Sequence, residues 1–231
     1  MSLPFFYVEE LASGVINLNE ENSKYITQVL RKQKGENVLL TNGKGLQAEA
    51  FIIDDHKKKC VVEILSGPHI SRQRNPVTIA ISLLKNINRF EWFLEKATEI
   101  GVTEIIPLLC DRTEKEKFRY DRLKTIMISA MLQSQQCWLP QLHQPTEFKK
   151  ITDLDYQQKF IAHCEEKEKK SLTENILLKN ASRIILIGPE GDFTPVEIEQ
   201  AITKDFIPVT LGETRLRTET AGIVAAVLLT Q

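Results

Sequence analysis

Two glycine-bearing loops near the C-terminus constrain the fold of this chain more than any other feature. The first, Ile187–Thr194, follows the apolar run Arg183–Ile187, and the second, Leu211–Ala221, follows the run Ile207–Leu211. Short apolar runs of this kind are typical of buried strands, and each loop leads into a helical pattern. Two strand–loop–helix units in succession predict an α/β sheet in which both loops lie at the carboxyl ends of neighbouring strands. Open α/β sheets bind their ligands at that edge.

The helix after the first loop has a clear start. Thr194 can cap it, Pro195 suits the first helical position, and Glu197 completes a capping box with Thr194. Gly188 and Gly191 allow the loop backbone to approach a ligand closely, and Pro189 stiffens the loop. An ordinary strand-to-helix turn that binds nothing is the alternative interpretation of this loop taken alone.

Composition limits the classes of protein. The 231 residues are 42% hydrophobic, which is enough for a large core in one large or two small domains. Lys and Arg number 30 against 31 Asp and Glu, so binding of nucleic acid would need a local basic face. The four cysteines form no Cys-x-x-Cys pair, which predicts reduced thiols and no metal site.

The sequence does not indicate a membrane protein. The segment Met1–Tyr7 is too short and uncharged for a signal peptide, and no apolar run approaches membrane-spanning length. We therefore expect a cytoplasmic protein.

The chain divides near Gly67 into a strand-rich part and an α/β part. Asn37–Thr41, Leu46–Ile53 and Lys59–Leu65 are expected strands joined by tight turns, which predicts a small barrel or sandwich with a helix near Ser23–Arg31 before it. A polar linker, 71–76, follows. Beyond it, strands and helices alternate, which favours a largely parallel sheet. The expected strands begin at Val77, Val102 and Lys159, the expected helices include one ending at Gly101 and one over Leu123–Met131, and the charged run Glu165–Lys170 is expected to be solvated.

The familiar nucleotide-binding fingerprints are missing. The one Gly-x-Gly sequence, Gly43–Gly45, lies between two expected strands and is interpreted as a hairpin turn rather than a dinucleotide site. A Walker loop is also absent. An adenosine cofactor would therefore need another architecture, which the loops at Gly188 and Gly212 supply.

The glycine loops resemble those of a known family. Gly188-Pro-Glu-Gly191 and Leu211-Gly212 followed by Leu216–Ala221 are similar to the RsmE family, the ribosomal small-subunit RNA methyltransferases that modify N3 of a uridine. Phe90–Leu108 and, more weakly, Tyr25–Arg31 match the same family. The resemblance implies a PUA-like RNA-binding β-barrel in residues 1–70. It also implies a SPOUT α/β methyltransferase domain with a C-terminal trefoil knot in residues 71–231.

The resemblance further implies an activity and its partners. These are S-adenosylmethionine-dependent methylation of uridine N3 in 16S ribosomal RNA, a small-subunit RNA substrate, and a homodimer without a metal or a membrane anchor. Which uridine is modified is not specified. A SPOUT enzyme acting on another RNA, or a non-enzymatic RNA-binding or ribosome-assembly factor with a vestigial pocket, are the alternatives.

Site residues follow from the same motifs. Arg217 is a candidate to stabilise negative charge on the uracil, and Glu219 or Glu190 is a candidate to accept the N3 proton. The structural alternatives are an ion pair between Arg217 and Glu219, or a bond from Glu219 to amides in the first helical turn. The residues implied to bind the cofactor are His163, Gly188, Pro189, Glu190, Gly191, Leu211, Gly212, Leu216, Thr220 and Ala221.

RNA binding needs cations on the surface. The candidates are Arg31, Lys32, Lys85, Arg89, Arg112 and Lys115. The segment around Gln133 departs from the family pattern, because Leu132 stands where an acid is usual and Gln136 stands where an arginine is common.

Overall fold

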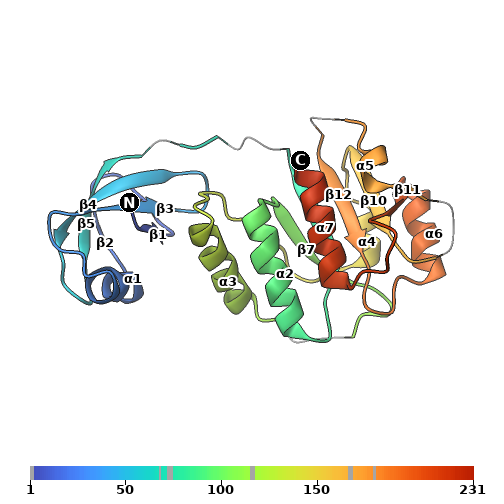
Figure 1. The fold of residues 1–231 in the computed structure, drawn as a ribbon, viewed down its shortest axis with the longest axis horizontal. Coiled ribbons are helices and arrows are strands. Elements are labelled where there is room, and N and C mark those ends of the chain that lie inside the picture. Colours follow the sequence, from blue (N-terminus) through green and yellow to red (C-terminus); the bar gives the residue numbers. More distant parts are fainter. Residues whose placement is uncertain (1–2, 68, 72–74, 115–117, 166–168, 179–180) are drawn as a thin grey trace. The chain divides into compact units, whose positions relative to one another are not determined.

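The computed structural model describes residues 3–67, 69–71, 75–114, 118–165, 169–178 and 181–231 (Figure 1). The chain forms two compact units. The first comprises residues 1–72 together with 131–139, and the second comprises 73–130 and 140–231.

The first unit is a five-stranded sheet with a short helix. The strands lie in the order β1-β3-β4-β5-β2, and all but the parallel pair of β1 and β3 are antiparallel. Its core contains Ile26, Val38, Leu40, Ile52 and Val62. The predicted strand-rich part and its helix are thus confirmed, and the helix ends in a π-helical turn. The bounds are β1 Phe5–Tyr7, β2 Val15–Asn17, α1 Glu20–Lys24, the π-helical turn Tyr25–Val29, β3 Asn37–Thr41, β4 Gln47–Asp54 and β5 Val61–Ser66.

A segment from much later in the chain completes this unit. Trp138 forms an antiparallel bridge with Lys44, and its indole nitrogen donates a hydrogen bond to the Ile70 carbonyl at 2.9 Å. Gly45, with a φ of 87°, lies so close to the indole that a Cβ there would overlap the ring. The interpretation of Gly43–Gly45 as a hairpin between two strands is confirmed. The absence of a side chain at Gly45 also leaves room for Trp138. The local sequence around Gly45 did not predict this contact.

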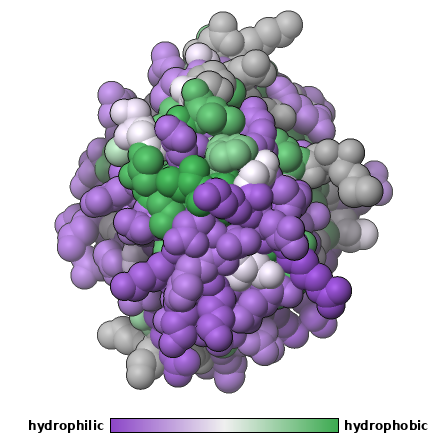
Figure 2. Space-filling model, turned by 90° about the vertical axis from the view of Figure 1, so that its left-hand side faces the viewer, coloured by the Kyte–Doolittle hydropathy of each residue, from purple (hydrophilic) through white to green (hydrophobic). Residues whose placement is uncertain are grey.

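The outer side of this sheet carries apolar residues. Val15 on β2 is 58% exposed and Leu65 on β5 is 54% exposed. Val15 pairs with Glu63, two residues before Leu65, so both side chains lie on the same side of the sheet. Figure 2 shows apolar surface surrounded by polar residues on the side of the molecule where the first unit faces the viewer.

The second unit contains a parallel sheet in the order β11-β13-β10-β12-β6-β7-β8, and β9 also pairs with β7. All its strand pairs are parallel, which confirms the predicted α/β class. The strands are β6 Val77–Ser82, β7 Glu104–Leu109, β8 Gln141–Leu142, β9 Thr146–Glu147, β10 Gln158–Ala162, β11 Lys170–Ser171, β12 Arg183–Ile187 and β13 Ile207–Thr210. The helices are α2 Ile87–Ile100, α3 Tyr120–Gln133, α4 Phe148–Thr152, α5 Leu172–Asn175, α6 Pro195–Thr203 and α7 Thr218–Thr230.

One topological prediction was wrong. The strands before the two glycine loops, β12 and β13, are not neighbours, because β10 lies between them and pairs with both. A crossover through a helix can pass over a strand already in the sheet, and local sequence does not record that choice. The carboxyl ends of β10, β12 and β13 nevertheless share one edge. The loop after β10, which contains the predicted cofactor residue His163, therefore lies at the same edge as the two glycine loops.

Helices cover both faces of this sheet (Figure 1). On one face, α7 packs on α2 and β6 so closely that a Cβ at Gly222 would lie 2.7 Å from the Phe93 ring and 2.8 Å from Ile81. On the other face, α4 and α6 bury Phe148 and Ile198 against the strands. The contact at Gly222 shows that α7 is fitted to its neighbours without room for a side chain.

Local signals for the helix ends are confirmed. The Thr194–Glu197 capping box begins α6, with Pro195 at the first position. Gly101 ends α2 in the left-handed conformation, with a φ of 91°. The buried Arg183 donates a hydrogen bond at 2.9 Å to the carbonyl oxygen of Leu229, near the C-terminal end of α7. It donates a second, at 2.6 Å, to the carbonyl oxygen of Leu178. Among the described residues, no helix has the length and apolarity needed to cross a membrane.

Candidate ligand-binding pocket

A pocket of about 370 Å³ lies where the loops after β10 and β12 meet the start of α7. All its lining residues belong to the second unit. Ala162 ends β10, Ile187 ends β12, and Arg89 lies in the first turn of α2. The lining residues are Arg89, Ala162, Cys164, Ile187, Gly188, Pro189, Glu190, Asp192, Arg215, Leu216, Arg217, Thr218 and Ala221.

The pocket brings together part of the predicted site. Of the predicted residues, Arg89, Gly188, Pro189, Glu190, Leu216, Arg217 and Ala221 line it. Leu211 and Gly212 line a separate hollow with Lys169, Ser171 and Thr173. His163, Gly191, Thr220 and Glu219 are beside the pocket in sequence but do not line it.

Sequence reasoning missed six lining residues. Four of them, Ile187, Asp192, Arg215 and Thr218, lie inside or beside the two motifs, so the motif signal could have found them. The other two, Ala162 and Cys164, flank the predicted residue His163 at the end of β10, so the expectation for that residue could have found them.

The first loop packs tightly against the core of the second unit. Gly188 and Pro189 are buried. A Cβ at Gly188 would lie 3.1 Å from the ring of Phe193 and 3.2 Å from its backbone nitrogen. Phe193 in turn packs on Phe148 in the core, with ring centroids 5.5 Å apart. A side chain at position 188 would therefore require Phe193 to shift by a few tenths of an ångström.

Arg112 fastens the same loop from the side. Its Nη1 donates hydrogen bonds to the carbonyl oxygens of Gly191, at 2.7 Å, and Phe193, at 3.4 Å. The buried carboxylate of Glu197 accepts from the backbone nitrogen of Asp111 at 2.9 Å, which fixes the residue before Arg112. Arg112 was predicted to contact RNA, and the structure gives it a part in holding the loop.

Glu190 lies at the exposed rim. One of its carboxylate oxygens accepts from the backbone nitrogen of Lys85 at 3.3 Å. The ammonium of Lys85 pairs with Glu114 at 3.1 Å, at the surface. The rim on this side therefore joins the first loop to the segment before α2.

The second loop presents cations. Arg215 and Arg217 are exposed and line the pocket, and within the described part of the chain neither forms an ion pair. Gly212, with a φ of 148°, opens the loop, and its carbonyl accepts from the Thr210 hydroxyl at 2.7 Å. Two guanidinium groups are therefore available to a ligand at the start of α7.

Glu219 is buried in the first turn of α7. It is 7% exposed, and its Oε1 lies 3.7 Å from Nε of Arg89. Its Oε2 is buried and has no hydrogen-bond partner among the residues that the structure describes. The ion pair of Glu219 is therefore with Arg89 from α2, and not with Arg217 as one prediction had it. A buried carboxylate oxygen without a partner is costly unless a ligand or water satisfies it.

The remaining predicted residues do not line the pocket. His163 is buried, and its carbonyl accepts from the Lys169 ammonium at 2.6 Å. Arg31 adopts a left-handed φ of 54°, and Lys32 pairs with Glu36 at 2.6 Å. Lys115 and residues 166–168 of the charged run lie outside the described residues, as do residues 72–74 of the expected linker.

Comparison with known proteins identifies the class that this fold and pocket define. Residues 71–230 match the RNA methyltransferase domain, and residues 18–65 match the PUA domain of RNA methyltransferases. The chain belongs to the RNA methyltransferase family, in which a PUA domain precedes the catalytic domain.

The relatives define the branch of that family. Ribosomal RNA small subunit methyltransferase E of Synechocystis sp. is 31% identical over 94% of this chain and 73% of its own length. The protein of the same name from Rickettsia conorii is 30% identical, over 90% of this chain and 85% of its own. The resemblance to the RsmE family is confirmed.

Solved structures agree over nearly the whole chain. A probable rRNA-methyltransferase from Porphyromonas gingivalis superposes with a TM-score of 0.92 at 35% identity, covering 97% of this chain and 95% of the other. A ribosomal RNA small subunit methyltransferase E from Neisseria gonorrhoeae, bound to S-adenosyl methionine, gives a TM-score of 0.86 at 29% identity with the same coverage.

Proposed function

We propose that this protein methylates N3 of a uridine in 16S ribosomal RNA with S-adenosylmethionine as the methyl donor. The observation that carries the proposal is the pocket at the carboxyl edge of the sheet, where both glycine motifs meet. The relatives that share the fold over nearly the whole chain are named as small-subunit ribosomal RNA methyltransferases, and one was solved with the cofactor.

The residues of the pocket suit this cofactor. Its volume falls within the range of small-molecule sites, and Leu216 and Ala221 add apolar surface. The lining includes Glu190 and Asp192 as well as three arginines, so both the cationic and the anionic groups of an amino-acid sulfonium meet opposite charge. When bound, S-adenosylmethionine supplies an electrophilic methyl group.

The protein's own residues provide the acid–base chemistry. Arg217 has no competing ion pair among the described residues, so it is available to stabilise negative charge on the uracil. Glu219 is the first candidate to accept the N3 proton, because its Oε2 has no partner in the described structure and the residue before it, Thr218, lines the pocket. Arg89 holds the other oxygen. Glu190 is a second candidate, since its carboxylate is at the rim.

The family match also supports the finer architecture. We expect the domains to be 1–70 and 71–231, with residues 131–139 completing the first unit, and we expect the C-terminal part to form the trefoil knot of SPOUT enzymes. RNA capture is assigned to Arg31 and Lys32 in the first unit and to Lys85, Arg89, Arg112 and Lys115 in the second. We expect the enzyme to act in the cytoplasm, on its ribosomal RNA substrate.

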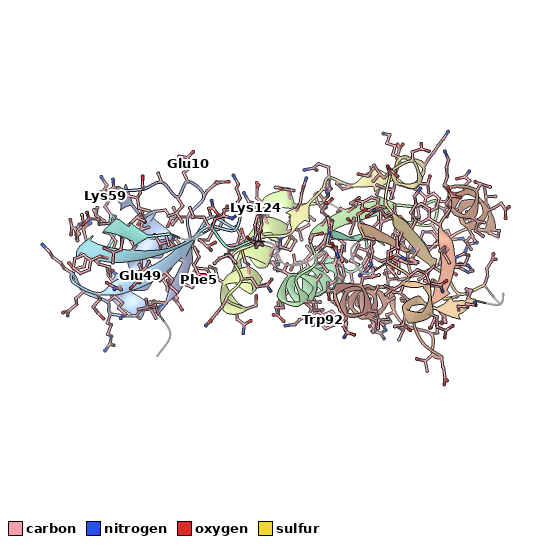
Figure 3. The ribbon with its side chains drawn as sticks, turned by 90° about the horizontal axis from the view of Figure 1, so that it is seen from above. Phe5, Glu10, Glu49, Lys59, Trp92 and Lys124 are labelled. Atoms are coloured by element: carbon pink, nitrogen blue, oxygen red, sulfur yellow. The ribbon has the colours of Figure 1, made fainter. Side chains whose placement is uncertain are left out.

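A homodimer completes the proposal. The helices α2 and α7 pack side by side on one face of the sheet (Figure 3). Each has an exposed apolar residue: Trp92 on α2 is 44% exposed, and Val227 on α7 is 37% exposed. Exposed apolar residues on adjacent helices are a common feature of subunit interfaces. Sedimentation should show a dimer in the wild-type protein, and Trp92→Glu should shift it toward a monomer. A wild-type monomer at micromolar concentration would contradict this expectation.

The single exposed thiol gives a direct test of the cofactor site. Cys164 lines the pocket and is exposed, whereas Cys60, Cys110 and Cys137 are buried. Burial raises the pKa of Cys60 to about 11 and raises the pKa values of Cys110 and Cys137, so these thiols react slowly at neutral pH. We expect S-adenosylmethionine to slow alkylation of Cys164 by iodoacetamide, measured by peptide mass spectrometry.

The reaction itself is tested on RNA. Mass mapping of 16S ribosomal RNA from a deletion strain, before and after complementation, should show one N3-methyluridine that returns with the gene. Protection of Cys164 without any change in the RNA would indicate a vestigial pocket or another RNA substrate. No protection at saturating cofactor would remove the pocket from the proposal.

A further inference from the structure

Asp192 adopts an unusual backbone conformation within the first glycine loop. Its φ is 62°, in the left-handed region that glycine occupies readily and that aspartate tolerates better than most residues. A glycine at this position would relieve the backbone. The side chain must therefore supply something that a glycine does not.

The carboxylate of Asp192 links two loops. Its Oδ2 accepts a hydrogen bond from the backbone nitrogen of Cys164, in the loop after β10, at 2.8 Å. Its Oδ1 accepts from the backbone nitrogen of Phe193 at 2.9 Å. Asp192 and Cys164 both line the pocket, and β10 and β12 are adjacent strands. The bond to Cys164 therefore connects two loops that form neighbouring walls of the pocket.

Other side-chain bonds support each of these two loops separately. Arg112 and Glu190 fasten the first loop to the segments after β7 and β6, respectively. Lys169 fastens the loop after β10 to itself, through the carbonyls of His163 and Glu165. These bonds do not involve Asp192. Changing Asp192 therefore removes its bond between the two loops and leaves these supports in place.

We propose that Asp192 is a positioning residue that sets the width of the cofactor pocket by tethering the loop after β10 to the glycine loop after β12. This inference rests on the proposed function, because the pocket must hold S-adenosylmethionine. Removing a charge-assisted hydrogen bond that preorganises a site should weaken binding roughly 10- to 100-fold.

Three variants distinguish the effect of the hydrogen bond to Cys164 from the effects of the carboxylate charge and of the backbone conformation. Asp192→Gly keeps the left-handed φ without strain and loses both acceptors, so the dissociation constant for S-adenosylmethionine should rise roughly 10- to 100-fold. Asp192→Asn tolerates the same φ and keeps one acceptor oxygen for Cys164 N–H, so its affinity should lie within about fivefold of the wild type. Asp205→Gly is the matched control.

Asp205 has the same residue type and a similar φ, 66°, after α6. Its side chain forms no hydrogen bond or ion pair among the described residues. The Asp205→Gly variant should therefore bind the cofactor like the wild type. Calorimetry and thermal unfolding on the same samples should show the loss of affinity in Asp192→Gly without a matching loss of melting temperature.

The outcomes distinguish the two proposals. If the wild type binds no S-adenosylmethionine, the proposed function fails. If the wild type binds and Asp192→Gly binds equally well, the tether has no role and this inference is overturned. An Asp192→Asn variant as weak as Asp192→Gly would also overturn it, because charge rather than position would then be the cause.

Discussion

Replacing Arg217 with alanine should lower the single-turnover rate of methyl transfer by about 100-fold or more. Arg217 lines the pocket, is exposed, and forms no ion pair among the described residues, so its charge is available to the reacting uracil or an adjacent phosphate. Removing one preorganised electrostatic contact of this kind typically costs about 2.7–4 kcal/mol in the transition state. The rate is measured under single turnover with saturating cofactor and RNA.

Two further variants control this result. Arg217→Lys keeps the charge but loses the planar fork, so it should restore the rate only in part. Arg215→Ala removes a second exposed arginine from the same loop, and its effect should be smaller if position 217 is the one that faces the reaction. An unchanged rate in Arg217→Ala, together with a lower melting temperature, would show that Arg217 only anchors the second loop.

The second large effect is expected at Gly188. A Cβ at this position would lie 3.1 Å from the Phe193 ring, and valine adds two further methyl groups, so either the ring or the loop must shift. We expect Gly188→Val to abolish measurable binding of S-adenosylmethionine. Overpacking against Phe193 should also cost about 1–3 kcal/mol of stability, while unfolding stays cooperative. Calorimetry and urea unfolding measure the two effects separately.

Gly191 provides the matched control within the same loop. A Cβ there would lie 3.4 Å from Cδ of Arg112, which is an ordinary van der Waals contact. Gly191→Ala should therefore bind the cofactor nearly as well as the wild type. Wild-type affinity in Gly188→Val would show that the cofactor does not depend on this loop.

The sequence predicted elements whose signals are local. The strand before the first loop, the Thr194 capping box and the glycine that ends α2 each depend on a few consecutive residues, and all three are confirmed. The parallel α/β class followed from the alternation of such elements. Local signals of this kind are strong because propensity, capping and burial agree over one segment.

Features that depend on distant segments could not be predicted. The place of β10 between β12 and β13 depends on crossover paths. The partner of Glu219 is Arg89, 130 positions earlier in the chain, and no periodicity relates the two. The catalytic and cofactor roles of these residues remain predictions that the variants above test.

Trp138 and its neighbours have a consequence for how the protein is made. The first unit includes residues 131–139, and Trp138 binds beside Gly45 and Ile70. Domains generally fold in order as the chain leaves the ribosome. Here the N-terminal unit lacks its last segment until position 139 has emerged, and by then β6, β7, α2 and most of α3 have already been synthesised as parts of the second unit. The N-terminal unit is therefore complete only after part of the second unit has been synthesised, and a continuous gene segment for residues 1–72 would lack residues 131–139 of that unit.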